Sequence, residues 1–217
     1  KSYSSYPIKL ALDPGVPNND GGLRPIAIIA PEGSVVNARP PAATWGRTMI
    51  AHLFPEIVFG ALENVMPDRI LAASGGTPAN EVYLHGKHAD GRSFMSIAQH
   101  TGGFGASARF DGYSTLCFPF NTRNIPVEVI ENEARVYYRK KEFLGDSGGP
   151  GYNRGGLGQT VEFCILDGGT AAAHHVESSV RISGRVETGP MPAFGRCGGG
   201  IGKGGGLWLN GKEVEHG

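Results

Sequence analysis

Residues 145–158 read Gly145-Asp146-Ser147-Gly148-Gly149-Pro150-Gly151-Tyr152-Asn153-Arg154-Gly155-Gly156-Leu157-Gly158. The two halves of this stretch favour different interpretations of the chain. The first half, 145–150, matches the segment around the nucleophilic serine of trypsin-like proteases. The second half contains an Arg-Gly-Gly-Leu-Gly run, which the protease interpretation does not explain. The interpretation of the chain therefore depends on which half is informative.

The rest of the chain argues against a serine protease. A serine nucleophile needs a histidine base and a carboxylate that orients this histidine. In trypsin-like enzymes the histidine precedes the serine in an Ala-Ala-His-Cys setting, which none of the histidines upstream of Ser147 has. The similar run Ala172-Ala173-His174-His175 follows the serine, and the chain has 3 cysteines rather than a set of disulfides. We therefore predict that Ser147 is a turn residue.

Glycine dominates the composition, with 35 glycines among 217 residues against a usual share of ~7%. The glycines follow no fixed period and stand between apolar or β-branched runs, which indicates an ordered protein with tight turns and close backbone approaches. Hydrophobic residues make up 40% of the chain and charged residues 18%, so disorder is not expected. The clusters are Gly21-Gly22, Gly75-Gly76, Gly102-Gly103, Gly148-Gly149, Gly155-Gly156, 198–200 and 204–206.

Charge and cysteine content argue against several classes of protein. The formal net charge is +0 and basic residues are scattered, so no nucleic-acid partner is expected. No apolar run approaches the ~18 residues that span a bilayer, so no membrane partner is expected. Few cysteines without a Cys-x-x-Cys motif fit a reducing compartment. These features predict a cytoplasmic protein.

The first residues favour a piece of a longer polypeptide. The chain begins at Lys1, and motif-like runs at 13–15 and 17–22 follow almost at once. A free domain usually opens with dispensable residues, and residues 1–6 lack the apolar region of a signal peptide. We expect a segment cut or processed from a larger chain.

One segment has a helical period. Between residues 42 and 65, apolar side chains recur at i, i+3, i+4 and i+7, which predicts a helix with one core-facing stripe. Pro55 lies inside this helix and is expected to kink or split it. The predicted stripe consists of Met49, Ile50, Leu53, Phe54, Ile57, Val58, Ala61 and Leu62.

The remaining apolar runs predict mostly strands. Residues 24–30 have the composition of a buried strand and 33–38 of a second short strand, while 7–12 fit a helix or a strand. The run 207–212 predicts a hairpin with an Asn-Gly turn. The pattern predicts an α+β fold, in which one main kinked helix packs on a β-rich, glycine-turn-rich domain of mixed or antiparallel strands. Further strands are expected at 81–85, 93–100, 134–143, 160–166 and 171–182.

Short blocks in colinear order carry a family resemblance: Asn18-Asn19-Asp20-Gly21-Gly22-Leu23-Arg24-Pro25-Ile26, Ala30-Pro31-Glu32-Gly33-Ser34, Asn37-Ala38-Arg39-Pro40-Pro41-Ala42, Gly102-Gly103-Phe104-Gly105-Ala106, Asp111-Gly112, Asn121, Pro126-Val127-Glu128-Val129-Ile130-Glu131, and 146–158. Together they resemble the hydantoinase B family. This family includes N-methylhydantoinase and 5-oxoprolinase B-type subunits and is related to acetone and acetophenone carboxylase subunits. The resemblance also accounts for 145–158 without a protease, because the family carries an Asp-Ser-Gly-Gly turn before the Arg-Gly-Gly-Leu-Gly element.

By this resemblance, residues 1–217 are the C-terminal portion of a longer B-type subunit. The resemblance implies a heteromeric ATP-dependent enzyme that hydrolyses a cyclic amide of the hydantoin, 5-oxoproline or lactam type. A divalent metal (Zn, Mn or Mg) and ATP are the expected cofactors, and both are expected to be bound elsewhere in the complex. The implied partners are the N-terminal half of the B-type subunit, the A-type ATP-using subunit, and a small cyclic amide or ketone. No metal ligand is assigned to this chain, which also lacks a Walker-type phosphate loop.

Two alternatives remain open. The related carboxylases imply ATP-dependent carboxylation of a ketone of the acetone or acetophenone type. The chain is also compatible with a non-catalytic structural subunit that only completes such a complex, because it is glycine-rich and charge-neutral and has no metal ligands of its own.

The segment 99–111 is the best candidate for facing a catalytic centre. It runs from a predicted strand into a glycine-rich bend, where a ligand can approach the backbone closely. His100 and Asp111 flank the bend and are the candidate catalytic residues. A packed or solvated histidine and a turn-capping aspartate are the competing interpretations. The candidate substrate-binding residues are Arg39, Gln99, Gly102, Gly103, Arg109, Asn121 and Glu128.

Other polar residues have structural interpretations of equal or greater weight. Arg39 could bind a carboxylate or phosphate with two hydrogen bonds, but a buried salt bridge is the commoner role. Glu128 could position water or pair at a strand end. His174 and His175 would point to opposite faces of a strand, which makes them poor joint metal ligands.

Overall fold

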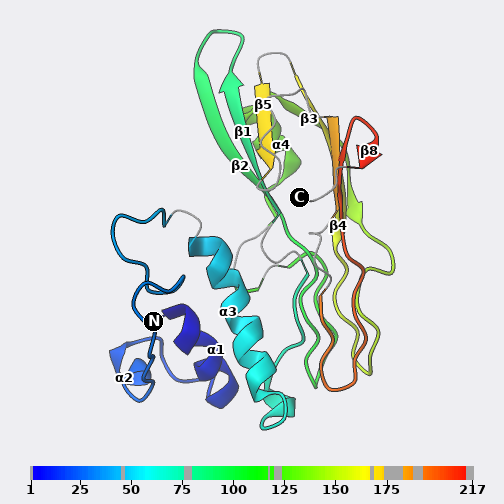
Figure 1. Cartoon of the computed structure of the whole chain (residues 1–217). Coiled ribbons are helices and arrows are strands. Elements are labelled where there is room, and N and C mark those ends of the chain that lie inside the picture. Colours follow the sequence, from blue (N-terminus) through cyan, green and yellow to red (C-terminus); the bar gives the residue numbers. More distant parts are fainter. Residues whose placement is uncertain are drawn as a thin grey trace.

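The structure is a computed structural model of the chain, and it describes residues 2–44, 47–75, 80–116, 118–119, 124–166, 169–173, 183–187 and 193–213. Helices come first and strands dominate the second half (Figure 1). This antiparallel α+β architecture agrees with the predicted fold class. The elements in order are α1 (Ser2–Leu12), α2 (Asp20–Leu23), α3 (Arg47–Leu62), the 3-10 helix η1 (Pro67–Arg69), β1 (Asn80–Lys87), β2 (Ser93–His100), α4 (Val127–Glu133), β3 (Val136–Phe143), β4 (Gln159–Ile165), β5 (Gly169–Ala173), β6 (Ser183–Glu187), β7 (Leu207–Leu209) and β8 (Lys212–Glu213).

Helices α1, α2 and α3 form a helical lobe at one side of the molecule (Figure 1). A small apolar cluster holds α1 against α3 and η1, with Ala11 0%, Phe59 2% and Ile70 4% exposed. The ring of Phe118 stacks on that of Phe59 at a centroid distance of 6.0 Å. Residues 7–12, which the sequence left open between helix and strand, lie in α1. Within the described residues, no helix is both long and apolar enough to cross a membrane.

The main predicted helix is present as α3, but a different face of it is buried. Its buried positions include Ala51, Pro55 and Phe59, which are spaced by four residues. Ile57, a member of the predicted stripe, is 64% exposed. Apolar side chains surround this helix, so the pattern alone could not select the face that packs. Pro55 lies inside one uninterrupted helix, and the kink stays a prediction.

From β1 onward, two antiparallel sheets and α4 make up the chain. The first has the order β2-β1-β5 and the second the order β3-β4-β6-β7-β8. The strands predicted at 81–85, 93–100, 134–143 and 160–166 are confirmed with small shifts at their ends. Of the strand predicted at 171–182, the first residues lie in β5 and residues 174–182 lie outside the described residues.

The predicted C-terminal hairpin is confirmed as β7 and β8. Leu209 pairs with Lys212 across the turn. Asn210 and Gly211 have φ values of 50° and 80°. Two consecutive left-handed residues are what a type I′ hairpin turn requires, and Asn-Gly is its preferred pair.

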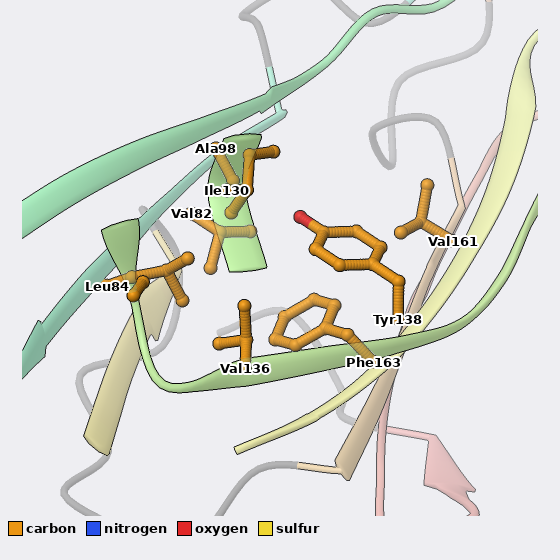
Figure 2. Packing of buried hydrophobic residues seen from close by; sticks show 9 residues of the cluster. Val82, Leu84, Ala98, Ile130, Val136, Tyr138, Val161 and Phe163 are labelled. Carbon is orange, nitrogen blue, oxygen red and sulfur yellow. The ribbon is translucent and has the colours of Figure 1, made fainter. Parts of the chain in front are cut away.

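The main core lies between the two sheets and α4 (Figure 2). Val82 and Leu84 alternate on β1, and Tyr138 and Phe163 face them from β3 and β4 (Figure 2). Ile130 of α4 is 1% exposed in the same cluster. The sequence analysis did not predict α4. Its signal was the spacing of Val127, Ile130 and Ala134 at i, i+3 and i+7.

Residues 24–30 and 33–38 are not strands, and both predictions are wrong. Apart from Arg24, which caps α2, they belong to an irregular segment that we call the arm (residues 25–44), in which no residue is buried. Ile29 is 94% exposed. The composition of these runs is typical of a buried strand, but a strand needs a neighbour to satisfy its backbone groups. Within the described residues the arm pairs with no strand.

Candidate functional site

Four glycine-rich segments lie against one another beside the sheets: 102–106, 111–113, 147–158 and 195–202. We call them the glycine-packed segments. Backbone hydrogen bonds join them, among which Phe104 N donates to Tyr113 O at 2.8 Å, Gly112 N to Arg154 O at 2.7 Å, Gly156 N to Phe104 O at 3.0 Å and Gly200 N to Pro150 O at 2.7 Å. The four segments thus contact one another through their backbones. These contacts are the close backbone approaches that the glycine content predicts.

These contacts explain why several positions are glycine. A Cβ atom at Gly103 would overlap the carbonyl oxygen of Gly156, and one at Gly148 would overlap that of Gly155. A Cβ at Gly105 would meet the carbonyl of Ala72 in the same way. A side chain at these positions would separate the segments and break their hydrogen bonds.

A hollow of about 350 Å³ opens beside the glycine-packed segments. We call it the glycine pocket. Many of its lining residues are glycines, and Phe104, Asn153 and Lys203 are among the others. Gly103 lines this pocket, whereas the other candidate site residues that the structure describes are not part of its wall. The predicted segment 99–111 therefore reaches the pocket in its middle, at 103–108, and not at its two ends.

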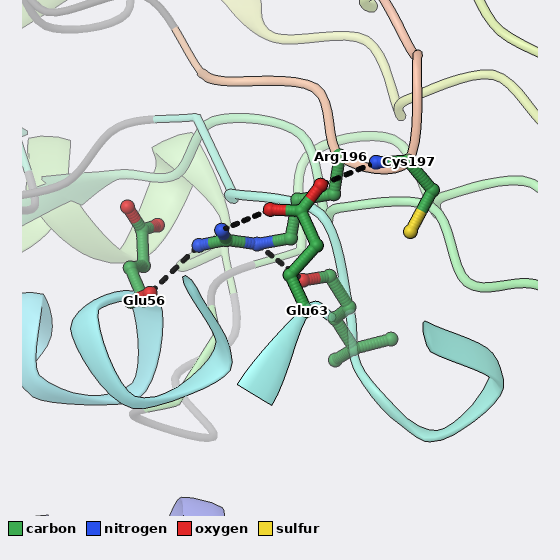
Figure 3. A network of polar contacts seen from close by, with 5 residues as sticks. Glu56, Glu63, Arg196 and Cys197 are labelled. Carbon is green, nitrogen blue, oxygen red and sulfur yellow. Dashed lines mark hydrogen bonds and ion pairs between the residues drawn. The ribbon is translucent and has the colours of Figure 1, made fainter. Parts of the chain in front are cut away.

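Arg196 fastens the loop 195–200 of the pocket to the helical lobe (Figure 3). Its guanidinium donates to Glu56 O at 2.7 Å and to Leu71 O at 3.1 Å, and it lies 3.5 Å from the Glu63 carboxylate. The same carboxylate accepts a hydrogen bond from Cys197 N at 2.6 Å. The Arg196 side chain is only 13% exposed. The sequence analysis did not select Arg196 as a functional residue. Its position between glycines was the only feature of the sequence that could have indicated its role.

Ser147 has the environment of a turn residue. Its hydroxyl donates to Leu144 O at 2.7 Å and accepts from Gly158 N at 2.8 Å. The neighbouring Asp146 has a φ of 53°, and its carboxylate lies 3.6 Å from the Arg154 guanidinium. The hydroxyl proton is therefore directed at a backbone carbonyl and not at a histidine base.

His100, a candidate catalytic residue, lies inside the main core at the end of β2. It is 1% exposed, and neither ring nitrogen has a hydrogen-bond partner among the described residues. Its ring contacts Tyr138 and Phe163 at centroid distances of 6.0 and 6.4 Å. Burial lowers the pKa of His100 to about 3, and the charge of Lys141 adds to this effect. The imidazole is consequently neutral at neutral pH.

Asp111, the other candidate catalytic residue, caps a turn of the glycine-packed segments. Its Oδ1 atom accepts a hydrogen bond from Arg154 N at 2.7 Å. Asp111 and Arg109 are both exposed, and Gln99 pairs with Glu81 across the first sheet. The structure thus brings Asp111 to the Arg-Gly-Gly-Leu-Gly element but does not bring it to His100 in a common cavity.

The remaining candidate residues are dispersed. Arg39 forms an exposed ion pair with Glu32 at 2.6 Å on the arm. Glu128 lies exposed in the first turn of α4. Gly102 is buried next to Gly103, and Asn121 lies outside the described residues.

A buried polar network adjoins the glycine-rich bend at 102–106. The sequence analysis did not predict this network. Thr101 Oγ1 donates to Thr115 O at 2.6 Å and accepts from Asn124 Nδ2 at 3.0 Å. Gln159 Nε2 donates to Thr101 O at 2.7 Å and to Asn124 Oδ1 at 3.0 Å. These bonds tie the end of β2 to the start of β4 and hold the glycine bend in place.

No group of three or more His, Cys, Asp or Glu side chains within the described ranges could hold a metal ion. His174 and His175 lie outside those ranges. The described residues therefore offer no such donor set for a divalent metal. Many glycines line the glycine pocket, and Asn153, Arg196 and Lys203 are among its other lining residues.

Comparison with known proteins adds to this geometry. The family model described as Hydantoinase B/oxoprolinase matches residues 1–217. An uncharacterized protein of Methanocaldococcus jannaschii is 36% identical over 157 residues, which cover 71% of this chain and 27% of that protein. The B-type subunit of a putative D-/L-hydantoinase, from Pseudomonas sp., is 28% identical over 155 residues, which cover 71% of this chain and 26% of that protein. The chain spans about a quarter of the length of these curated relatives.

A solved structure shares the fold. It is a nucleotide-free acetone carboxylase, from a study of the mechanism of ATP-dependent acetone carboxylation, and it superimposes with a TM-score of 0.72 at 16% identity. The match covers 93% of this chain and 26% of that chain. Nearly the whole chain therefore has the fold of one portion of a much longer polypeptide.

Proposed function

The chain belongs to the hydantoinase B/oxoprolinase family, and we propose that it is part of a B-type subunit of a heteromeric, ATP-dependent enzyme. The proposed reaction is hydrolysis of a cyclic amide of the hydantoin, 5-oxoproline or lactam type. The observation that carries this proposal is the family match over residues 1–217, together with the similarity to the B-type polypeptide of a hydantoinase.

The roles that we propose for this chain, the N-terminal part of the subunit and the A-type partner follow from what the described residues contain. They lack a metal-binding cluster, so the metal-assisted step is assigned to the N-terminal part of the subunit and the use of ATP to the A-type partner. This chain contributes the wall of the glycine pocket. Backbone N–H groups in such a wall can donate hydrogen bonds to a carbonyl or phosphate oxygen without any side chain.

Ketone carboxylation is the second candidate function. The fold shared with an acetone carboxylase over 93% of this chain favours it. The test is ATP turnover by the complex purified from cells that make it. Hydantoins, 5-oxoproline, caprolactam and ketones are supplied separately, with and without bicarbonate. Turnover with a cyclic amide and without bicarbonate supports the hydrolase, whereas turnover that requires a ketone and bicarbonate supports the carboxylase. No turnover with either class supports a non-catalytic subunit.

The catalytic roles of His100 and Asp111 remain proposals with a direct test. We expect His100→Ala and Asp111→Asn to lower turnover at least ~10-fold, or about 1.4 kcal/mol in the barrier, while the complex stays assembled. Asn keeps an oxygen that can accept the hydrogen bond from Arg154 N, so its effect reports the charge of Asp111. Normal turnover of both assembled variants would assign structural roles to the two residues.

A further inference from the structure

The arm (residues 25–44) is exposed along its whole length. Of its residues only Ile26, Ala30 and Ser34 are half-buried, and none is buried. It leaves the helical lobe after α2 and returns at the start of α3 (Figure 1). Such a segment would ordinarily lack a defined shape, because no core holds it.

The arm nevertheless has a defined shape, because it is hydrogen-bonded to itself. Gly33 N donates to Asn37 O at 2.8 Å, and Asn37 Nδ2 donates to Ala30 O at 2.9 Å. Ser34 Oγ donates to Pro31 O at 2.6 Å. Gly33 has a φ of 81°, the left-handed conformation that glycine adopts without strain. The arm therefore presents a preformed loop, which lowers the entropic cost of binding a partner.

The side chains that this loop presents are aliphatic. Ile29 is 94% exposed, Val35 73%, Val36 48% and Ile28 37%. These four residues form two adjacent pairs in the sequence, 28–29 and 35–36. Exposed apolar surface is unfavourable by about 25 cal/mol per Å², and large exposed apolar patches mark surfaces that another molecule covers.

The charges of the arm are neutralised within the chain. Arg39 pairs with Glu32 at 2.6 Å, and Arg24 at the base of the arm pairs with Asp20 at 2.8 Å. The arm thus offers no unpaired charge for a nucleic acid or a strongly charged protein to recognise. An apolar protein surface is the complementary partner.

A groove of about 390 Å³ on the same lobe provides a second apolar feature. Tyr3 and Tyr6 of α1 line it together with Pro55 of α3 and with Pro119. Leu23, which directly precedes the base of the arm, also lines it. The groove therefore extends to the end of α2, two residues before the arm begins.

We propose that the arm and this groove form a docking surface for the polypeptide that the family's longer relatives carry beyond the portion matched here. The fold of this chain occupies 26% of the acetone carboxylase chain, and the matched segments occupy 26–27% of the curated relatives. A unit that makes up a quarter of a longer polypeptide must present surface to the remainder, and the aliphatic arm is suited to that contact. This inference rests on the proposed function as part of a B-type polypeptide.

The first experiment places a photo-crosslinking amino acid at Val35 in the complex purified from cells that make it. Met95 on β2 is the matched control, because it is exposed to the same extent, 73%. We expect crosslinks from position 35, and not from position 95, to peptides of a polypeptide that resembles the rest of a B-type subunit. Crosslinks to a second copy of this chain, to the A-type subunit or to lipid would overturn the proposal, and so would no crosslink.

The second experiment compares Val35→Asp with Met95→Asp in the same complex. We expect Val35→Asp to lower the recovered B-type remainder at least tenfold and Met95→Asp to leave it unchanged. Each isolated variant should unfold at nearly the wild-type temperature, because exposed side chains contribute little to folding. Equal recovery with both variants would overturn the docking surface. A complex that crosslinks as expected but turns over neither cyclic amides nor ketones would instead contradict the proposed function alone.

Discussion

In the core between the two sheets, Phe163, Leu84 and Ile130 are at most 2% exposed, and their side chains fill the space between the elements. In the glycine-packed segments the elements approach so closely that a Cβ at Gly103 would overlap the carbonyl of Gly156. The first region gains stability from buried apolar area, the second from backbone hydrogen bonds across a short distance. The first region loses stability when a buried side chain is removed, whereas the close backbone contacts of the second lose it when an atom is added.

The largest effect is expected from removing a side chain in the sheet core. Phe163→Ala should lower the free energy of unfolding by about 4 kcal/mol, because it leaves a cavity at a site that is 2% exposed. Phe143→Ala on β3, where the ring is 61% exposed, is the control and should cost far less. Denaturant unfolding monitored by circular dichroism measures both. Equal costs would show that the sheet core does not stabilise by burial.

The glycine-packed segments should respond to the opposite change, the addition of one methyl group. Gly103→Ala should lower the free energy of unfolding by about 3 kcal/mol, because backbone atoms must move apart. Gly145→Ala is the matched control, since a Cβ there meets nothing within 4 Å. Thermal unfolding distinguishes the two variants. A stable Gly103→Ala protein would show that close backbone packing does not constrain this region.

His100 joins the two regions, since it ends β2 in the sheet core and precedes the glycine bend. Its pKa lies at about 3 in the fold and near 6.5 in the unfolded chain. The unfolded chain therefore takes up a proton first, and stability falls as the pH drops from about 6.5 towards 3. At pH 5 this loss should be about 2 kcal/mol relative to neutral pH. His100→Phe should remove it, which denaturant midpoints at pH 7 and pH 5 measure; an unchanged pH dependence would contradict the burial of a neutral imidazole.

The smallest effect is expected at Ser147. Ser147→Ala removes the hydroxyl that bonds to Leu144 O and Gly158 N, at a cost of about 1–2 kcal/mol. Activity of the complex should stay within a few-fold of wild type, and a fluorophosphonate should not label the native protein. Stoichiometric labelling, together with a loss of activity of several orders of magnitude, would restore the protease interpretation.

Several elements were predictable because their signals are local. The strands predicted at 93–100 and 134–143 and the Asn210-Gly211 turn depend on neighbours in sequence, and all three are confirmed. The arm was wrongly predicted as strands, because a strand is stabilised by a pairing partner that can lie anywhere in the chain. The buried face of α3 was also wrong, because Phe59 was selected by contact with Ala11 and not by its own spacing.

The candidate site was predictable only in part. Gly103 lies in the wall of the glycine pocket, and its role in binding a ligand stays a prediction. Arg196 was missed, because its partners Glu56 and Glu63 are more than 130 positions away in the sequence. The roles of His100 and Asp111 remain predictions, although the structure places the first in the core and the second at a turn.

The amino-acid sequence alone determined the family, the α+β class and the presence of many close backbone approaches, because motif order, side-chain period and glycine content are local properties. Only the tertiary structure decided which glycine meets which carbonyl, where His100 lies, and that the aliphatic run of the arm faces water. These are properties of pairs of distant residues. A hydrophobic segment in the sequence indicates that another surface should bury it. Only the fold shows whether this chain itself provides that surface.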